Sequence, residues 1–159
     1  MTRKFLTDAT INGETIATQT WVNSQIGGSW STYTPTWAST GTQPVIGNGT
    51  LAGRYKQQGK VVHYEVLMIA GTTTTFGTGT WTFSLPVTGR TPATFRPMGT
   101  LRMVDVSATA VYNGFLTSND GATVAANTSA SPGASVNSVT PYAWANTDYA
   151  YLAGTYEAA

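Results

Sequence analysis

The pattern of hydrophobic and polar positions divides the chain into two parts that meet near residue 28. After that point apolar residues recur at every second position, which is the spacing of half-buried β-strands. Before it, residues 17–26 show helical spacing, with a rough apolar face formed by Trp21, Val22 and Ile26. The pattern predicts an N-terminal arm over residues 1–28, containing one short helix, and a β domain over residues 29–159.

The clearest strand pair lies in TLAGRYKQQGKVVHYEVLMIA, residues 50–70. A two-residue turn at Gln58 and Gly59 would place Tyr55 opposite Val62 and align the apolar residues of both strands on one face. Because a one-residue slip would turn every side chain to the other face, this alternation strongly favours a hairpin here.

The second strand of that hairpin also carries Leu67 and Ile69 on the face opposite to its alternating apolar residues. A strand that is apolar on both faces is normally covered on both. We therefore expect Leu67 and Ile69, together with His63 on the same face, to lie at a seam between subunits. Cover by a loop of the same chain is the alternative.

Further strands are predicted by alternation at residues 81–85, 98–105, 108–116, 122–126 and 148–158. Between the last two, the chain is rich in small polar residues and is predicted to be mostly loop. About eight short strands separated by turn residues predict an all-β fold, namely an antiparallel β-sandwich that resembles a jelly roll.

Composition excludes several classes of function. Charged residues make up 9% of the chain, with 8 basic and 7 acidic side chains and a net charge of +1, so no basic face for nucleic acid is expected. No apolar run approaches the roughly 18 residues of a membrane span, so no membrane insertion is expected. No signal peptide is visible, which predicts synthesis in a cytoplasm, and the absence of cysteine excludes disulfides and thiolate metal sites.

No combination of residues predicts catalysis or a metal site. His63 is the only histidine, and no nucleophile motif accompanies it. The acidic residues form no spaced pair in the sequence, and a lone acid in the SNDG turn supplies too few oxygens for calcium. We expect a non-enzymatic protein without a cofactor, with a hydrolase whose acids meet only in space as an alternative.

Two aromatic residues, Tyr142 and Trp144, lie in the small polar segment that covers residues 117–147. Exposed aromatic rings stack on ligands and anchor interfaces. We therefore predict that this pair contacts a receptor, with ordinary packing in the core as the alternative.

The arm resembles a known family. KFLTDATINGETIATQTWVNSQI, residues 4–26, resembles the opening of many bacteriophage tail-fibre and minor tail proteins, in which a KFLT…NG segment precedes an AT…YV helix that begins the trimeric part. Trp21 stands where that family has tyrosine. YTPTW, GNGTLAGRYKQQGKVVHYEV and WTFSLP resemble a β domain that recurs in phage tail proteins, which extends the resemblance to about residue 87. Tail fibres are usually longer and have a shaft, whereas here the arm joins the β domain almost directly.

The resemblance implies a homotrimeric virion protein, located on the tail rather than the capsid surface, that attaches to the host cell and takes a surface glycan as a candidate ligand. Its arm would contact other virion proteins and its own copies through Phe5, Leu6, Ile11, Trp21, Val22 and Ile26. Two alternatives stay open. One is a capsid decoration or head-fibre protein, and the other is a monomeric carbohydrate-binding module.

Overall fold

A computed structural model of the chain describes residues 10–11, 14–15, 29–90, 98–118, 120–130 and 134–159. Every regular element in this part of the chain is a β-strand. In chain order the strands are β1 (Thr10–Ile11), β2 (Glu14–Thr15), β3 (Ser31–Tyr33), β4 (Trp37–Ser39), β5 (Thr50–Gln58), β6 (Val61–Ile69), β7 (Trp81–Ser84), β8 (Met98–Asp105), β9 (Ala110–Thr117), β10 (Thr123–Thr128) and β11 (Tyr149–Glu157). The prediction of an all-β fold is confirmed for the described residues.

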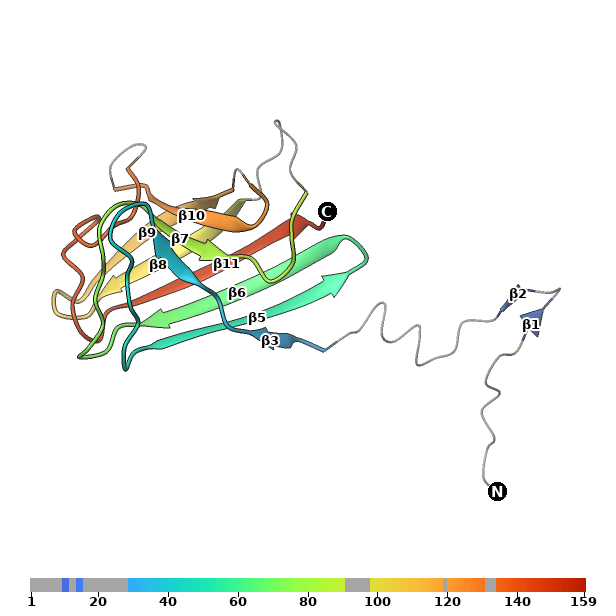
Figure 1. Ribbon diagram of the computed structural model, residues 1–159, viewed down its shortest axis with the longest axis horizontal. Helices are drawn as coiled ribbons and strands as arrows, with labels where there is room; N and C mark the ends of the chain where they lie inside the picture. The colour runs from blue at the N-terminus through green and yellow to red at the C-terminus, as the bar shows by residue number, and fades with distance from the viewer. Residues whose placement is uncertain (1–9, 12–13, 16–28, 91–97, 119, 131–133) are drawn as a thin grey trace, which may run out of the picture.

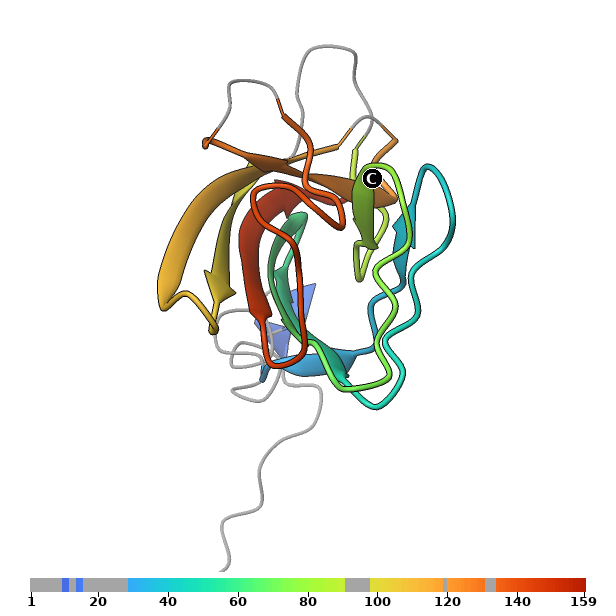
Figure 2. The same ribbon diagram turned by 90° about the vertical axis from the view of Figure 1, so that its left-hand side faces the viewer.

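Nine of these strands form one antiparallel sheet in the order β3-β5-β6-β11-β8-β9-β10-β7-β4, and β1 pairs with β2 separately (Figure 1). Seen from the end, the sheet curls into a half-barrel around its own interior (Figure 2). The prediction of two packed sheets is therefore wrong. A twisted antiparallel sheet of this width can coil far enough to enclose a core by itself.

The two edges of the sheet are strands that follow each other directly in the sequence. β3 pairs with β5 at one edge, and β4 pairs with β7 at the other. Between them stands Pro35, which has no backbone N–H to give to a ladder, so it favours an interruption of the strand at this point. Tyr33 and Thr36 both hydrogen-bond to Ser84, which ties the crossing to β7.

The core lies inside the curl. Alternate residues of the strands point inward and are almost fully buried, as the sequence pattern predicted for Val62, Tyr64, Val66 and Met68. Trp81, Phe83, Leu152 and Tyr156 are buried in the same way. Two loops close the open side of the curl, one between β4 and β5 and the other between β6 and β7. Backbone hydrogen bonds between Val45 and Thr75 join them. Trp81 Nε1 donates to the carbonyl of Phe76 at 3.0 Å, which fixes the second of these loops over the core.

The β5–β6 hairpin is confirmed, but its predicted register is wrong by two residues. Tyr55 pairs with Tyr64 rather than with Val62, and the two turn residues are Gly59 and Lys60. Gly59 has a φ of 57°, whereas Lys60 is not among the described residues with positive φ. A turn with glycine first and an ordinary residue second matches the type II′ hairpin, which favours glycine at that position. A slip of two residues leaves each side chain on its predicted face.

The predicted helix over residues 17–26 lies outside the described residues. So do Phe5, Leu6, Trp21, Val22 and Ile26, while Ile11 belongs to β1, where its backbone pairs with Glu14. The predicted boundary near residue 28 is likewise at the edge of what the structure describes.

Candidate functional site

The outer face of the sheet, on the far side from the core, carries the side chains that are open to a partner. On β6 these are Val61, His63, Glu65, Leu67 and Ile69, which alternate with the buried residues of the same strand. The sheet register sets them in rows across β5, β6 and β11. Along β6, the outer-face side chains Leu67 and Ile69 are apolar, whereas His63 and Glu65 are polar. This divides the outer face into an apolar end and a polar end.

The apolar end consists of Leu67, Ile69, Tyr149, Tyr151 and Val111. By register, Ile69 lies beside Tyr149 and Leu67 lies beside Tyr151, and Val104 bridges Tyr149 to Val111. Ile69, Tyr151 and Val111 are 37%, 39% and 51% exposed. Neighbouring apolar side chains therefore form a patch on the outer face, and Leu67 and Ile69 are both part of it. Their predicted place at a seam between subunits stays a prediction.

The polar end consists of Trp30, Arg54, His63, Glu65 and Thr155. His63 was predicted to share the seam with Ile69, but the two are six residues apart on one strand, which is about 20 Å. His63 instead lies opposite Thr155, and its Nδ1 is 2.8 Å from the Thr155 hydroxyl oxygen. The structure therefore separates His63 from the apolar patch.

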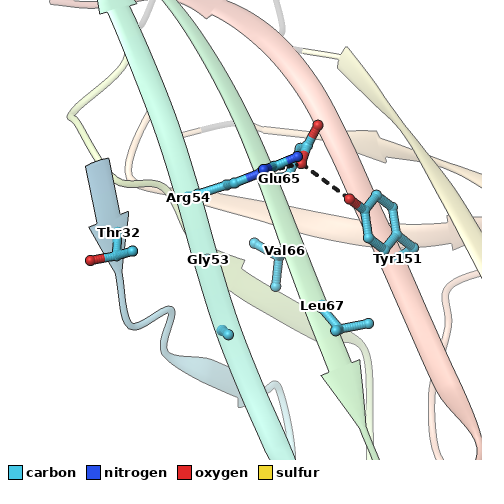
Figure 3. A pocket seen from close by; sticks show the side chains of 8 residues that line it. Thr32, Gly53, Arg54, Glu65, Val66, Leu67 and Tyr151 are labelled. Carbon is cyan, nitrogen blue, oxygen red and sulfur yellow. Dashed lines mark hydrogen bonds and ion pairs between the residues drawn. The ribbon is translucent and has the colours of Figure 1, made fainter. Parts of the chain in front are cut away.

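A hydrogen-bonded group of three side chains marks the boundary between the two ends. Arg54 Nε donates to Glu65 Oε2 at 2.6 Å, and the Tyr151 hydroxyl donates to the same oxygen at 3.1 Å (Figure 3). The bond from Arg54 lowers the pKa of Glu65 most, with a smaller lowering by Tyr151, against a partial opposing effect of burial. Glu65 is therefore a carboxylate at neutral pH, oriented by neighbours on both sides.

Trp30, just before β3, lies over this group. The Arg54 guanidinium carbon is 4.8 Å from the centre of the Trp30 ring, a cation–π contact. Trp30 is nevertheless 42% exposed. The contact fixes the ring on the outer face while leaving much of it open to solvent.

Two hollows flank Glu65 on the outer face. One, of about 290 Å³, lies toward the apolar end and includes Thr32, Leu67 and Tyr151 in its lining (Figure 3). The other, of about 390 Å³, lies toward the polar end and includes Trp30, His63 and Thr155. Small side chains create both depressions, because Ala52 lines the first and Ala153 lines the second, each among larger neighbours.

Tyr142 and Trp144 do not lie on an exposed surface. They are 9% and 6% exposed, and their rings stack on each other with centroids 4.8 Å apart inside the core. Trp144 also packs against Trp81 at 5.0 Å. The prediction that these rings are open to a receptor is wrong, and the alternative of core packing is confirmed. The segment that carries them looked like an exposed loop because it is polar, yet its two large apolar side chains turn inward and help to fill the curl.

The acidic side chains of the described domain each have a structural partner. Glu157 pairs with Arg90, Asp105 and Asp120 accept bonds from nearby turn residues, and Asp148 holds two backbone amides. Within the described ranges, no group of three or more metal-ligating side chains comes together. In the same part of the chain there is also no helix long and apolar enough to cross a membrane.

The sequence did not place Trp30, Glu65, Tyr151 and Thr155 together in one candidate site. Part of the signal was present, because alternation already placed the β6 residues on the outer face and put Tyr149 and Tyr151 on one face of β11. The predicted register paired Arg54 with His63, and the observed register pairs it with Glu65. Comparisons with protein-family models, with curated proteins and with solved structures found no match.

Proposed function

We propose that this chain is a non-enzymatic structural protein of a phage virion, and that a homotrimer of it attaches the particle to the host cell surface. The observation that carries the proposal is the apolar end of the outer face, where Ile69, Tyr151 and Val111 stand open in the single chain. A contiguous apolar patch on a small domain is a common mark of a contact surface. Burying it removes apolar area from water, which favours association.

A second copy of the chain is the proposed occupant of that patch. The chain has a net charge of only +1, so copies would repel one another little. Arg102 lies beside Tyr151 in the register, and its Nη1 donates to the Tyr149 hydroxyl at 3.3 Å. The phenol does not neutralise the guanidinium charge, so Arg102 would have to stay at the solvated rim of the contact, because burying an unpaired charge is costly.

The arm is proposed to hold the trimer on the particle. This part rests on the resemblance of residues 4–26 to phage tail proteins, and the proposed contacts are Phe5, Leu6, Ile11, Trp21, Val22 and Ile26. A short helix over residues 17–26 would be marginal alone and would gain stability from the same helix in other copies. The domain would then face outward from the tail, after synthesis in the host cytoplasm.

Electron microscopy with a gold-labelled antibody against residues 29–159 tests the proposal on intact particles. Label at the end of the tail is the expected result. Label spread over the capsid would contradict host attachment and support a decoration protein in its place. Particles that carry no label would contradict a virion role altogether, and a free monomer that binds sugar would then favour a carbohydrate-binding module.

A further inference from the structure

The hollow at the polar end of the outer face has no part in the proposed assembly, and we propose that it binds one neutral hexopyranose unit of a glycan. Its volume is about 390 Å³, and the residues that matter here are Trp30, His63, Glu65, Ala153 and Thr155. Protein sites for small ligands usually start near this size, at about 300 Å³. Only the source of the glycan, a host surface, rests on the proposed function.

The hollow exists because of a small residue between large ones. Ala153 lies on the outer face of β11, with Tyr151 and Thr155 on either side of it along the strand and Glu65 opposite it on β6. Its methyl group leaves a depression where a longer side chain would fill the space. The floor is part of the sheet ladder, so the depression keeps its shape without a ligand.

Trp30 gives the hollow an aromatic wall. The face of an indole ring carries partial negative charge, and the C–H groups on one side of a pyranose ring carry partial positive charge, so the two surfaces stack. Arg54 holds the Trp30 ring at 4.8 Å, which reduces the conformational freedom that the ring would lose on binding.

The polar groups of the hollow suit sugar hydroxyls. Both bonds that Glu65 accepts go to Oε2, so among the described residues Oε1 has no donor and can accept from a hydroxyl. His63 bonds to Thr155 through Nδ1, so Nε2 takes no part in that bond and can pair with a sugar hydroxyl. Because Arg54 neutralises Glu65, the hollow holds hydrogen-bonding capacity without an excess of charge, which favours a neutral sugar over a charged one.

Nuclear magnetic resonance on the full chain tests this directly, because His63 is the only histidine and its ring signals report on this one hollow. The probes are the methyl glycosides of glucose, galactose, mannose and N-acetylglucosamine, each titrated singly. We expect at least one of them to shift the His63 signals saturably with a millimolar dissociation constant. We expect Trp30→Ala to weaken that binding about tenfold or more.

Phe115→Ala is the matched control, since Phe115 is another exposed aromatic residue of the outer face and does not line the hollow. Thr155→Val, which keeps the side-chain shape, should weaken binding. Phe115→Ala and Thr155→Val should both keep the unfolding midpoint near that of wild type. The proposal is overturned if none of the four sugars shifts the His63 signals, or if Phe115→Ala weakens binding as much as Trp30→Ala. A trimer that fails to bind sugar would overturn this inference alone and leave the assembly proposal intact.

Discussion

Arg54 on β5 and Glu65 on β6 are direct cross-strand partners, and the guanidinium Nε donates to the carboxylate Oε2 at 2.6 Å. Tyr151 on β11 donates to the same oxygen, so one carboxylate links three neighbouring strands on the outer face. The apolar patch lies on one side of this link and the hollow with Trp30 lies on the other. The pair thus separates the surface proposed for assembly from the one proposed for a ligand.

Glu65 should make stability depend on pH in the acid range. Its bond from Arg54 holds the pKa of the carboxyl below the ordinary 4.5, so the folded state favours the charged form. This contribution is fully present above the ordinary pKa and is lost as the pH falls through the lower folded value. Between about pH 6 and pH 3, urea unfolding should show a larger loss of stability for wild type than for Glu65→Gln. Equal losses would contradict this assignment.

Tyr156 should make the protein less stable in alkali. Burial raises the pKa of its phenol from 10.0 to about 12, against the opposing bond from the Val87 amide. Above pH 10 the unfolded chain ionises while the folded chain keeps the proton, so the free energy of unfolding falls by about 1.4 kcal/mol per pH unit for one such group. Urea unfolding at several pH values above neutrality measures this slope. Tyr156→Phe should be less stable at neutral pH and should show a shallower slope, and an unchanged slope would contradict the account.

Asp148 should be essential for the loop that brings Tyr142 and Trp144 into the core. It is 1% exposed, and its two oxygens accept from different amides, Val106 N at 2.9 Å and Ala145 N at 2.7 Å. In Asp148→Asn an amide NH₂ would face one of these N–H donors, which should cost about 1–3 kcal/mol of stability.

Asp105→Asn is the matched control for that change, measured in the same urea titration. Asp105 accepts the Ser107 hydroxyl and the Ala108 amide on the same oxygen, Oδ1, and an asparagine carbonyl can replace that acceptor. We expect Asp105→Asn to lower stability much less than Asp148→Asn. Equal losses of stability would contradict the claim that Asp148 needs both of its oxygens as acceptors.

Tyr142 should contribute through its ring and not through its hydroxyl. The hydroxyl is buried and has no hydrogen-bond partner among the residues that the structure describes. The ring packs on Trp144, with centroids 4.8 Å apart, and on Tyr112, with centroids 5.0 Å apart. Tyr142→Phe should therefore leave stability within about 1 kcal/mol of wild type or raise it, because an unpaired buried polar group is unfavourable.

Tyr142→Ala removes the ring itself and should cost about 3–5 kcal/mol, as large-to-small changes in a core do. Thermal unfolding followed by circular dichroism measures both variants. A destabilisation by Tyr142→Phe as large as that by Tyr142→Ala would show that the hydroxyl has an essential partner.

Local alternation predicted much of the fold. Period-two spacing identified the strands at Trp81, Val62 and Leu152, because burial on one face imposes that spacing directly. For the strand that contains Val62 it also identified the side that faces the core. The predicted pairing of β5 with β6 was two residues off, since a Gln-Gly pair is a weak turn signal. The positive φ of Gly59 shows that this residue comes first in the turn.

The curled sheet and the outer hollow could not be predicted in the same way. β3 and β4 are separated by three residues yet pair at opposite edges, and nothing local specifies such a long-range choice. Tyr142 and Trp144 were misplaced because the polarity of their neighbours was taken to indicate exposure. Trp30, Glu65 and Thr155 come together only through the register across β5, β6 and β11.

The central claim is that the apolar end of the outer face is a contact between copies, and light scattering of the purified full chain at micromolar concentration tests it most directly. Wild type should have about three times the 16.8 kDa mass of one chain. Ile69→Lys should give a folded monomer, while Val61→Lys, an exposed residue on the same face at the far end of β6, should stay trimeric. A wild-type monomer, or a trimer that Ile69→Lys leaves unchanged, would contradict the account.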